Sequence, residues 1–185
     1  MDNKEKIKPQ GRENPGPWKL LLHDLEPSIA ASLFPNCTED QGWLVFSKDD
    51  SIHHCIGCFG CWVKTPGICV IQDKHGHMGE YLAQCTELVL ISQCCYGGPS
   101  PFVKNVLDRS ISYLHPYFVI KNKEMHHRQR YQRTIDLRVL FYGKNLTQNE
   151  RKTAIKWVNA MAINLYCHVK QVLWQENPAE LEALL

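Results

Sequence analysis

The order of apolar and polar positions along the chain predicts strands that alternate with helices. Five short, mainly apolar runs have the length of strands in a parallel sheet: residues 18–23, 42–47, 87–92, 135–142 and 168–174. Between several of these runs, apolar residues recur at the spacing of one helix face. Alternation of this kind predicts an α/β domain built on a parallel sheet.

Two of the predicted helices have clear signals. From Ser100 onward, apolar residues recur at intervals of three and four, which is typical of one buried helix face. Thr147 and Glu150 have the spacing of a capping box, so a second helix is expected to begin after Thr147. Shorter helical pieces are expected around residues 29–34 and 79–84.

The two ends of the chain differ from this pattern. Residues 1–17 are polar and contain three prolines, so they predict a flexible leader. The folded domain is expected to cover residues 18–174, and the acidic tail, residues 175–185, to add one or two helical turns.

Composition narrows the class of protein only slightly. A chain of 185 residues with 44% hydrophobic content suits one globular domain, and its formal net charge of +2 favours no charged partner. Because no apolar run has the length of a membrane span or follows the N-terminus as a signal peptide would, we expect a cytoplasmic protein without membrane or nucleic-acid partners. The odd number of cysteines, nine, favours reduced thiols or metal ligands over disulfides.

Four of those cysteines form the densest chemical feature of the chain. They lie in a loop predicted for residues 53–72, with the spacing C-x2-C-x2-C-x7-C, and are Cys55, Cys58, Cys61 and Cys69. Three thiols at intervals of three residues can converge on one inorganic centre, with the fourth completing it. This compact run suits an iron–sulfur cluster better than zinc, whose sites usually pair two separated knuckles. Zinc and unliganded or redox-active thiols remain as alternatives.

Ligands of open parallel sheets bind beyond the carboxyl ends of the strands. Here three turns follow predicted strands, and the cysteine loop is expected to reach the same rim of the sheet. A basic insertion at residues 115–134 precedes the fourth predicted strand. It is interpreted as a solvated loop, with a lid over the rim, a nucleotide-phosphate site or support of a dimer as alternatives.

Three segments in order, CIGCFGCWVKTPGICVI, SQCCYGGPSPFVKNVLDRS and FYGKNLTQNERKTA, resemble the flavodoxin-like NAD(P)H-dependent FMN reductases and their iron–sulfur flavoprotein relatives. The resemblance covers about residues 18–174. It implies a flavodoxin-like three-layer sandwich whose five-stranded parallel sheet has the order 2-1-3-4-5, with FMN at the rim, NAD(P)H as substrate and a homodimeric assembly. It also implies a four-iron cluster on the four cysteines of the loop.

The same resemblance implies which residues would contact the flavin. The set comprises one hydroxyl of the first helix, the turn after the third strand and the turn after the fourth: Ser28, Ser92, Cys94, Cys95, Tyr96, Gly97, Gly98, Ser100, Tyr142, Gly143 and Lys144. The chain gives no indication of a catalytic acid, base or nucleophile.

One departure from the family concerns the phosphate of FMN. The family's first loop is rich in glycine and hydroxyl residues, whereas this chain has HDLEPSIAAS, with Asp24 and Glu26 where a phosphate would lie. Two hypotheses follow. The first is an oxidoreductase that passes electrons among NAD(P)H, FMN and an acceptor protein, with a cluster as relay. The second is a flavin-less scaffold or partner subunit whose cysteines hold structural zinc or act as redox thiols.

Overall fold

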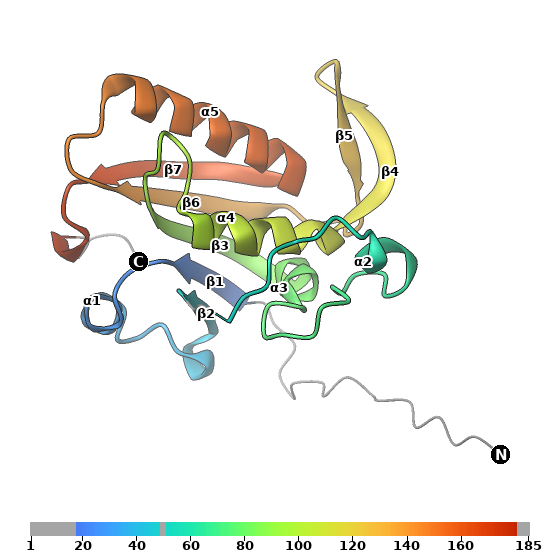
Figure 1. Cartoon of the computed structure of the whole chain (residues 1–185), viewed down its shortest axis with the longest axis horizontal. Coiled ribbons are helices and arrows are strands. Elements are labelled where there is room, and N and C mark those ends of the chain that lie inside the picture. Colours follow the sequence, from blue (N-terminus) through green and yellow to red (C-terminus); the bar gives the residue numbers. More distant parts are fainter. Residues whose placement is uncertain (1–17, 49–50, 181–185) are drawn as a thin grey trace.

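The computed structural model describes residues 18–48 and 51–180 (Figure 1). The leader predicted for residues 1–17 and the last part of the tail, residues 181–185, lie outside the described residues. Within them, no helix is both long enough and apolar enough to cross a membrane.

A five-stranded parallel sheet forms the centre of the domain. Its strands are β1 (Trp18–His23), β2 (Trp43–Ser47), β3 (Cys85–Gln93), β6 (Ile135–Tyr142) and β7 (Cys167–Gln175). They lie side by side in the order β2-β1-β3-β6-β7. Counted among the sheet strands alone, this is the order 2-1-3-4-5, so the prediction is confirmed. Each predicted strand agrees with the observed one to within two residues at either end.

Helices cover the two faces of the sheet unequally (Figure 1). The α-helices are α1 (Pro27–Leu33), α2 (Gly60–Val63), α3 (Met78–Gln84), α4 (Pro101–Arg109) and α5 (Gln148–Leu165). Short 3-10 segments are η1 (Glu39–Gln41), η2 (Ser110–Tyr113) and η3 (Pro178–Glu180). α3, α4 and α5 pack on one face, whereas α1 lies on the other.

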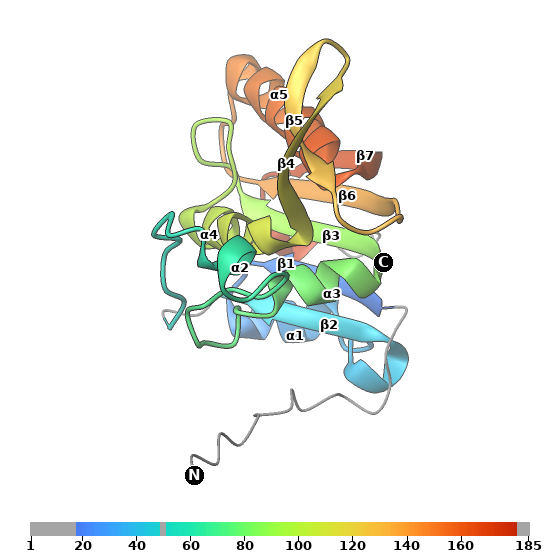
Figure 2. The same cartoon turned by 90° about the vertical axis from the view of Figure 1, so that its right-hand side faces the viewer.

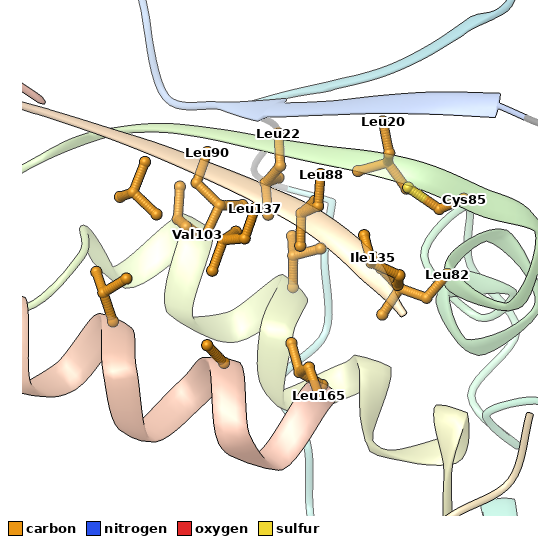
Figure 3. Close-up of a cluster of buried hydrophobic side chains, with 14 of the residues drawn as sticks. Leu20, Leu22, Leu82, Cys85, Leu88, Leu90, Val103, Ile135, Leu137 and Leu165 are labelled. Carbon is orange, nitrogen blue, oxygen red and sulfur yellow. The ribbon is translucent and has the colours of Figure 1, made fainter. Parts of the chain in front are cut away.

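The larger core lies between the sheet and α3, α4 and α5. Leu20 and Leu22 of β1 and Leu88 and Leu90 of β3 point to this face and are at most 1% exposed (Figure 3). They meet apolar side chains of the helices, such as Val103 of α4. Side chains alternate between the two faces of a strand, so the even-numbered leucines fix the register of β1 against its helical layer.

The opposite face is apolar at one end and charged at the other. Near the carboxyl ends of the strands, α1 covers a smaller core that contains Leu21 and Ile91. Toward the amino ends, Glu87 accepts contacts from Lys19 at 3.8 Å and from Arg138 at 2.9 Å. This half of the face therefore carries ion pairs in place of a helical layer among the residues described.

Local sequence explains where the two longest helices begin. In α5, Thr147 accepts a hydrogen bond from the Glu150 amide at 3.2 Å, and the Glu150 carboxylate accepts one from the Thr147 amide at 2.9 Å. The predicted capping box is thus confirmed. In α4, the Ser100 hydroxyl accepts from the Val103 amide, and Pro101 occupies the first turn, where it loses no helical hydrogen bond.

The basic insertion forms an antiparallel hairpin, so the interpretation as a solvated loop is wrong. Its strands are β4 (Leu114–Lys121) and β5 (Glu124–Gln129), joined through Asn122 and Lys123, which both have positive φ. Aromatic and β-branched residues in β4 favour a strand, and the two left-handed turn residues match the right-handed twist of a hairpin.

The position of the hairpin also excludes the predicted lid. α4 starts beyond the carboxyl end of β3 and runs toward the amino end of β6, and the hairpin lies at this second end (Figures 1 and 2). The hairpin is therefore on the opposite side of the domain from the rim.

Candidate functional site at the carboxyl ends of the strands

The carboxyl ends of β1, β3 and β6 meet at one rim, where the predicted flavin residues gather. The turn after β3 is joined to β6 by a hydrogen bond of 2.8 Å from the Cys94 amide to the Tyr142 carbonyl. The turn after β6 is joined to β7 by the bond from the Gly143 amide to the Gln175 carbonyl, at 3.0 Å. This is the switch point of the strand order, where ligands of such sheets bind.

Asp24, the first residue after β1, is at the centre of this rim. Its carboxylate accepts hydrogen bonds from the Gln93 amide at 3.0 and 3.2 Å and from the Ser92 hydroxyl at 3.3 Å. The Tyr142 hydroxyl faces the same carboxylate; burial first, and then the charge of Asp24, raise the pKa of this hydroxyl well above its usual value. Asp24 is only 8% exposed, so this hydrogen-bonded carboxylate is a structural part of the rim.

The hydroxyls of Ser92 and Ser100 both form hydrogen bonds within the protein. Ser92 accepts a hydrogen bond from the Ser100 amide at 2.8 Å, while the Ser100 hydroxyl caps α4. Both side chains are buried. Ser28, in contrast, is exposed on the first turn of α1. The proposed contacts of these three hydroxyls with a flavin stay predictions.

The turn after β3 is a tight, rigid hairpin turn. Cys95 and Gly98 exchange two backbone hydrogen bonds of 2.8 and 2.9 Å, and the residues between them, Tyr96 and Gly97, both have positive φ. A Cβ atom at Gly97 would lie 2.6 Å from a carbon of Thr153 in α5, so only glycine fits there. Tyr96 at the tip is 94% exposed, and its ring is free to stack on a ligand.

A pocket of about 420 Å³ lies beside the rim, between β1 with α1 and the end of β2. Its lining mixes apolar and ionisable side chains: His23, Leu25, Glu26, Ala30, Val45 and Lys48. His23 is 2% exposed, and burial lowers its pKa although Asp24 opposes the effect. The pocket lies on the β2 side of β1, away from the switch point between β1 and β3.

The rim does not fit the phosphate of FMN. The connection from β1 to α1 consists of Asp24, Leu25 and Glu26, so it holds two acids and no glycine. Pro27 opens α1 without an amide hydrogen, and α1 has no side-chain cap. A phosphate dianion there would meet negative charges and few donors, which is unfavourable in a partly buried site.

The cysteine loop lies at the other end of α4, so the expectation that it reaches the rim is wrong. Arg109, the last residue of α4, donates to the His53 and Ile71 carbonyls at 2.8 and 3.2 Å. The Trp62 indole of α2 donates to the Leu114 carbonyl at the start of β4, at 2.9 Å. The loop therefore packs where α4 ends, next to η2 and the hairpin (Figure 2).

The other three thiols of this loop are near enough to Cys61 to influence its pKa. Burial raises the pKa of Cys61 first, and the nearby Cys69, Cys55 and Cys58 raise it further in that order. Cys61 and Cys69 are each 9% exposed, whereas Cys55 and Cys58 are exposed. As they stand, no three His, Cys, Asp or Glu side chains within residues 18–48 and 51–180 are close enough together to hold a metal ion. Two buried and two exposed thiols nevertheless give a donor set suited to a soft metal or an iron–sulfur cluster, provided that the exposed pair closes onto the buried pair.

A buried ion pair holds this loop in place. The two guanidinium nitrogens of Arg109 contact the two carboxylate oxygens of Asp73 at 2.8 and 2.9 Å, and the Asp73 carboxylate also accepts from the His53 and His75 amides at 3.3 and 2.9 Å. Burial alone would lower the pKa of Arg109, but the hydrogen bonds that it donates to Asp73 and then to Cys69 raise it. Sequence reasoning missed Arg109 because nothing in the helical pattern of α4 distinguishes it from a surface arginine.

The parallel sheet, its strand order and the rim at the switch point define a flavodoxin-like fold. Solved structures agree. An NADPH-quinone reductase from P. pentosaceus has a TM-score of 0.54 at 9% identity over 89% of this chain and 91% of its own. A Trp repressor binding protein from Bacillus subtilis has a TM-score of 0.50 at 12% identity over 88% of this chain and 89% of its own. No protein-family model and no curated protein sequence matches the chain.

Proposed function

We propose that the protein is a flavodoxin-like oxidoreductase that transfers electrons between NAD(P)H, a flavin and an acceptor. The observation that carries this proposal is the position of Tyr96, an exposed ring held on a rigid turn at the switch point of the sheet. The name of the P. pentosaceus protein pairs NADPH with a quinone on the same fold, which supports redox chemistry of this class.

In this proposal the flavin is an exchangeable substrate that is held by its ring. Tyr96 stacks on the ring, the backbone at Gly97 and Gly98 approaches its edge, and the β6 turn at Gly143 and Lys144 forms the second wall. Aromatic stacking is worth about 0.5–1.5 kcal/mol beyond the area that it buries. The flavin supplies the exchange between two-electron and one-electron chemistry, and the protein supplies binding and orientation.

The second part of the proposal concerns the cysteine loop. We assign a four-iron cluster to Cys55, Cys58, Cys61 and Cys69, because one loop carries four thiols, the number of ligands that such a cluster requires, and the other three lie near the buried Cys61. Arg109 beside Cys69 offsets part of the negative charge of four thiolates. The acceptor would be another protein, the working unit a homodimer and the compartment the cytoplasm, where thiols stay reduced.

The experiment that tests this function is a visible spectrum of anaerobically purified protein, with iron, acid-labile sulfide, zinc and flavin assayed on the same sample. Flavin binding with iron and sulfide near about four per chain supports both parts. Flavin without iron leaves a flavin reductase with structural cysteines. Iron or zinc without flavin binding, even with added riboflavin, contradicts the flavin part.

One observation favours a second candidate function. The Asp24 carboxylate accepts the hydrogen bonds of the Gln93 amide and the Ser92 hydroxyl at the rim, so these donors need no ligand. A protein that had lost its flavin would require such an internal acceptor. In that case the domain is a scaffold or partner subunit, and the cysteine loop is a structural zinc site or a redox-sensing group of thiols. Absence of NAD(P)H oxidation with any flavin or quinone, together with bound zinc, would identify it.

A further inference from the structure

The pocket beside β1 contains a buried polar group that has no partner. His23 lines this pocket and is 2% exposed, and among the residues described its Nδ1 atom has no hydrogen-bond partner. Its ring lies 6.4 Å from the ring of Phe34, between centroids, a contact that packs the imidazole but satisfies neither nitrogen. Because buried polar groups in proteins are normally hydrogen-bonded, an exception in the wall of a pocket indicates the place of a ligand atom.

The pocket is a gap between α1 and the edge strand β2. Alternation along β1 places Leu21 and His23 on the face of the sheet that α1 covers. In the next strand, Val45 and Ser47 lie beside them. Val45 is nevertheless 42% exposed. Ala30, which lines the gap from α1, ends at its Cβ atom, so the helix leaves space beside Val45 that a ligand can enter.

Two charges of opposite sign line this gap. Glu26 belongs to the connection from β1 to α1, and Lys48 directly follows β2. Within residues 18–48 and 51–180 neither side chain forms an ion pair, and Glu26 does not cap α1. Burial lowers the pKa of His23, against the effect of Asp24, so the pocket has no net charge near neutral pH. A simple anion would be repelled by Glu26 and a simple cation by Lys48, whereas a zwitterion complements both.

The rest of the lining and the size of the pocket limit the ligand further. Part of the lining is apolar and consists of Leu25, Pro27, Ala30 and Val45. The volume of about 420 Å³ is in the lower part of the range of small-molecule sites, about 300–1,000 Å³. The ligand is therefore small, and it combines two opposite charges with a compact apolar group.

We propose that this pocket binds a free α-amino acid with an apolar side chain. Its ammonium group donates to Nδ1 of His23 and to the Glu26 carboxylate. Its carboxylate accepts from Lys48 and from the Ser47 hydroxyl, and its side chain packs against Val45. His23, Glu26 and Lys48 thereby gain partners that the described residues do not supply. The inference is independent of the proposed function, because none of the residues proposed to contact the flavin lines the pocket.

Calorimetric titration of the full chain with leucine, phenylalanine and tryptophan tests the ligand class. Each amino acid is compared with two analogues that lack one charge; for phenylalanine these are 3-phenylpropionate and 2-phenylethylamine. We expect at least one amino acid to bind with a Kd below about 1 mM, and both of its analogues to bind at least about tenfold more weakly. Absence of binding by all three, or an analogue that binds as tightly as its amino acid, overturns the proposal.

Variants of the lining test the position of the site. Glu26→Gln and Lys48→Met should each weaken binding of the amino acid about fivefold, as expected for exposed charge pairs. Val45→Trp fills the gap and should abolish binding. Lys152→Met is the matched control, since Lys152 is an exposed lysine on α5, and it should leave the affinity unchanged.

The analogues also test the orientation of the ligand. Affinity for the analogue without a carboxylate should not fall in Lys48→Met, because the charge that Lys48 contacts is absent from it. Equal losses for this analogue and for the amino acid would contradict the pairing with Lys48. Equal losses in Lys48→Met and Lys152→Met, or full binding by Val45→Trp, would place the ligand elsewhere and overturn the proposal.

Discussion

Asp73 and Arg109 form a buried, two-pronged ion pair that fastens the cysteine loop to the end of α4. The side chain of Arg109 is fully buried and that of Asp73 is 9% exposed. The guanidinium and the carboxylate join at 2.8 and 2.9 Å, and each also bonds to backbone groups of the loop. The position of four thiols thus depends on one residue that is 40 positions later than Cys69 in the sequence.

Removal of one partner should cost far more than the pair itself contributes. Arg109→Met leaves the Asp73 carboxylate without its counter-charge, and we expect the free energy of unfolding to fall by about 3–5 kcal/mol. Urea denaturation measures this fall. Lys104→Met is the control, because it removes the exposed pair Lys104–Asp108 and should cost less than about 1 kcal/mol. Equal losses in the two variants would contradict the role given to Arg109.

The same pair predicts a pH dependence of stability. Burial alone would raise the pKa of Asp73, but hydrogen bonds from Arg109 and from the His53 and His75 amides outweigh burial and lower it. Because the pKa of Asp73 is lower in the folded than in the unfolded protein, the ionised carboxylate stabilises the fold fully above the unfolded-state pKa, near 3.9. This stabilisation is lost as the pH falls through the folded-state pKa. Urea midpoints of the wild type and of Asp73→Asn should therefore converge below about pH 4. An equal difference between the two urea midpoints at pH 7 and at pH 3 would contradict this prediction.

Two glycines with similar backbone angles should respond differently to alanine. Gly97 and Gly42 have φ of +82° and +77°, but a Cβ atom would meet α5 at 2.6 Å at Gly97 and nothing within 4 Å at Gly42. Gly42→Ala should cost only the left-handed backbone, about 1–2 kcal/mol. Gly97→Ala should cost more, about 3 kcal/mol, because overpacking adds to it. Thermal or urea unfolding of the two variants tests the difference, and equal costs would argue against tight packing of the turn on α5.

Charge at the rim should discriminate between flavins. We expect riboflavin to bind more tightly than FMN, and the double variant Asp24→Asn, Glu26→Gln to raise FMN affinity about thirtyfold, since two repulsions of about 1 kcal/mol each are removed. Riboflavin affinity should change little, which makes riboflavin the internal control. Fluorescence titration measures both ligands. Tighter binding of FMN than of riboflavin by the wild type would show that a phosphate site exists.

Thiol reactivity should divide the cysteines into two groups. Burial, as the largest cause, raises the pKa of Cys85 and of Cys167 to about 12, whereas Cys55 and Cys58 are exposed. A thiol reagent at pH 7.5 should label Cys55 and Cys58 within minutes in metal-free protein and leave Cys85 and Cys167 unmodified until unfolding. Mass spectrometry of quenched samples assigns each site. Protection of Cys55 and Cys58 after reconstitution with iron and sulfide would support the cluster.

Strand positions and the capping box were predictable because they depend on local patterns. Buried runs such as residues 18–23 and 135–142 carry the period of a strand within a few residues, and Thr147 with Glu150 is a signal four residues long. Strand order came from the family resemblance, since no local pattern sets which strands are neighbours. The rim followed from the strand order through a general rule for parallel sheets.

The location of the cysteine loop could not be read in the same way. It depends on long-range contacts, such as those of Arg109 with Asp73 and of Trp62 with the Leu114 carbonyl, and these partners are far apart in sequence. The hairpin was missed because its basic residues drew attention to charge, while the strand-forming residues of β4 carried the structural signal. Asp24 was recognised as an obstacle to phosphate, but its hydrogen bonds to the end of β3 need the fold to be seen.

The nine residues of α4 separate Ser100 at the rim from Arg109 at the cysteine loop by about 14 Å. The rim and the cysteine loop thus lie at opposite ends of one helix. Substitutions that retune the redox potential of a centre at one end should leave ligand selectivity at the other unchanged. An engineered exchange of the cysteine loop that keeps the rim must therefore retain the Asp73–Arg109 pair, because Arg109 belongs to the helix that connects the two sites.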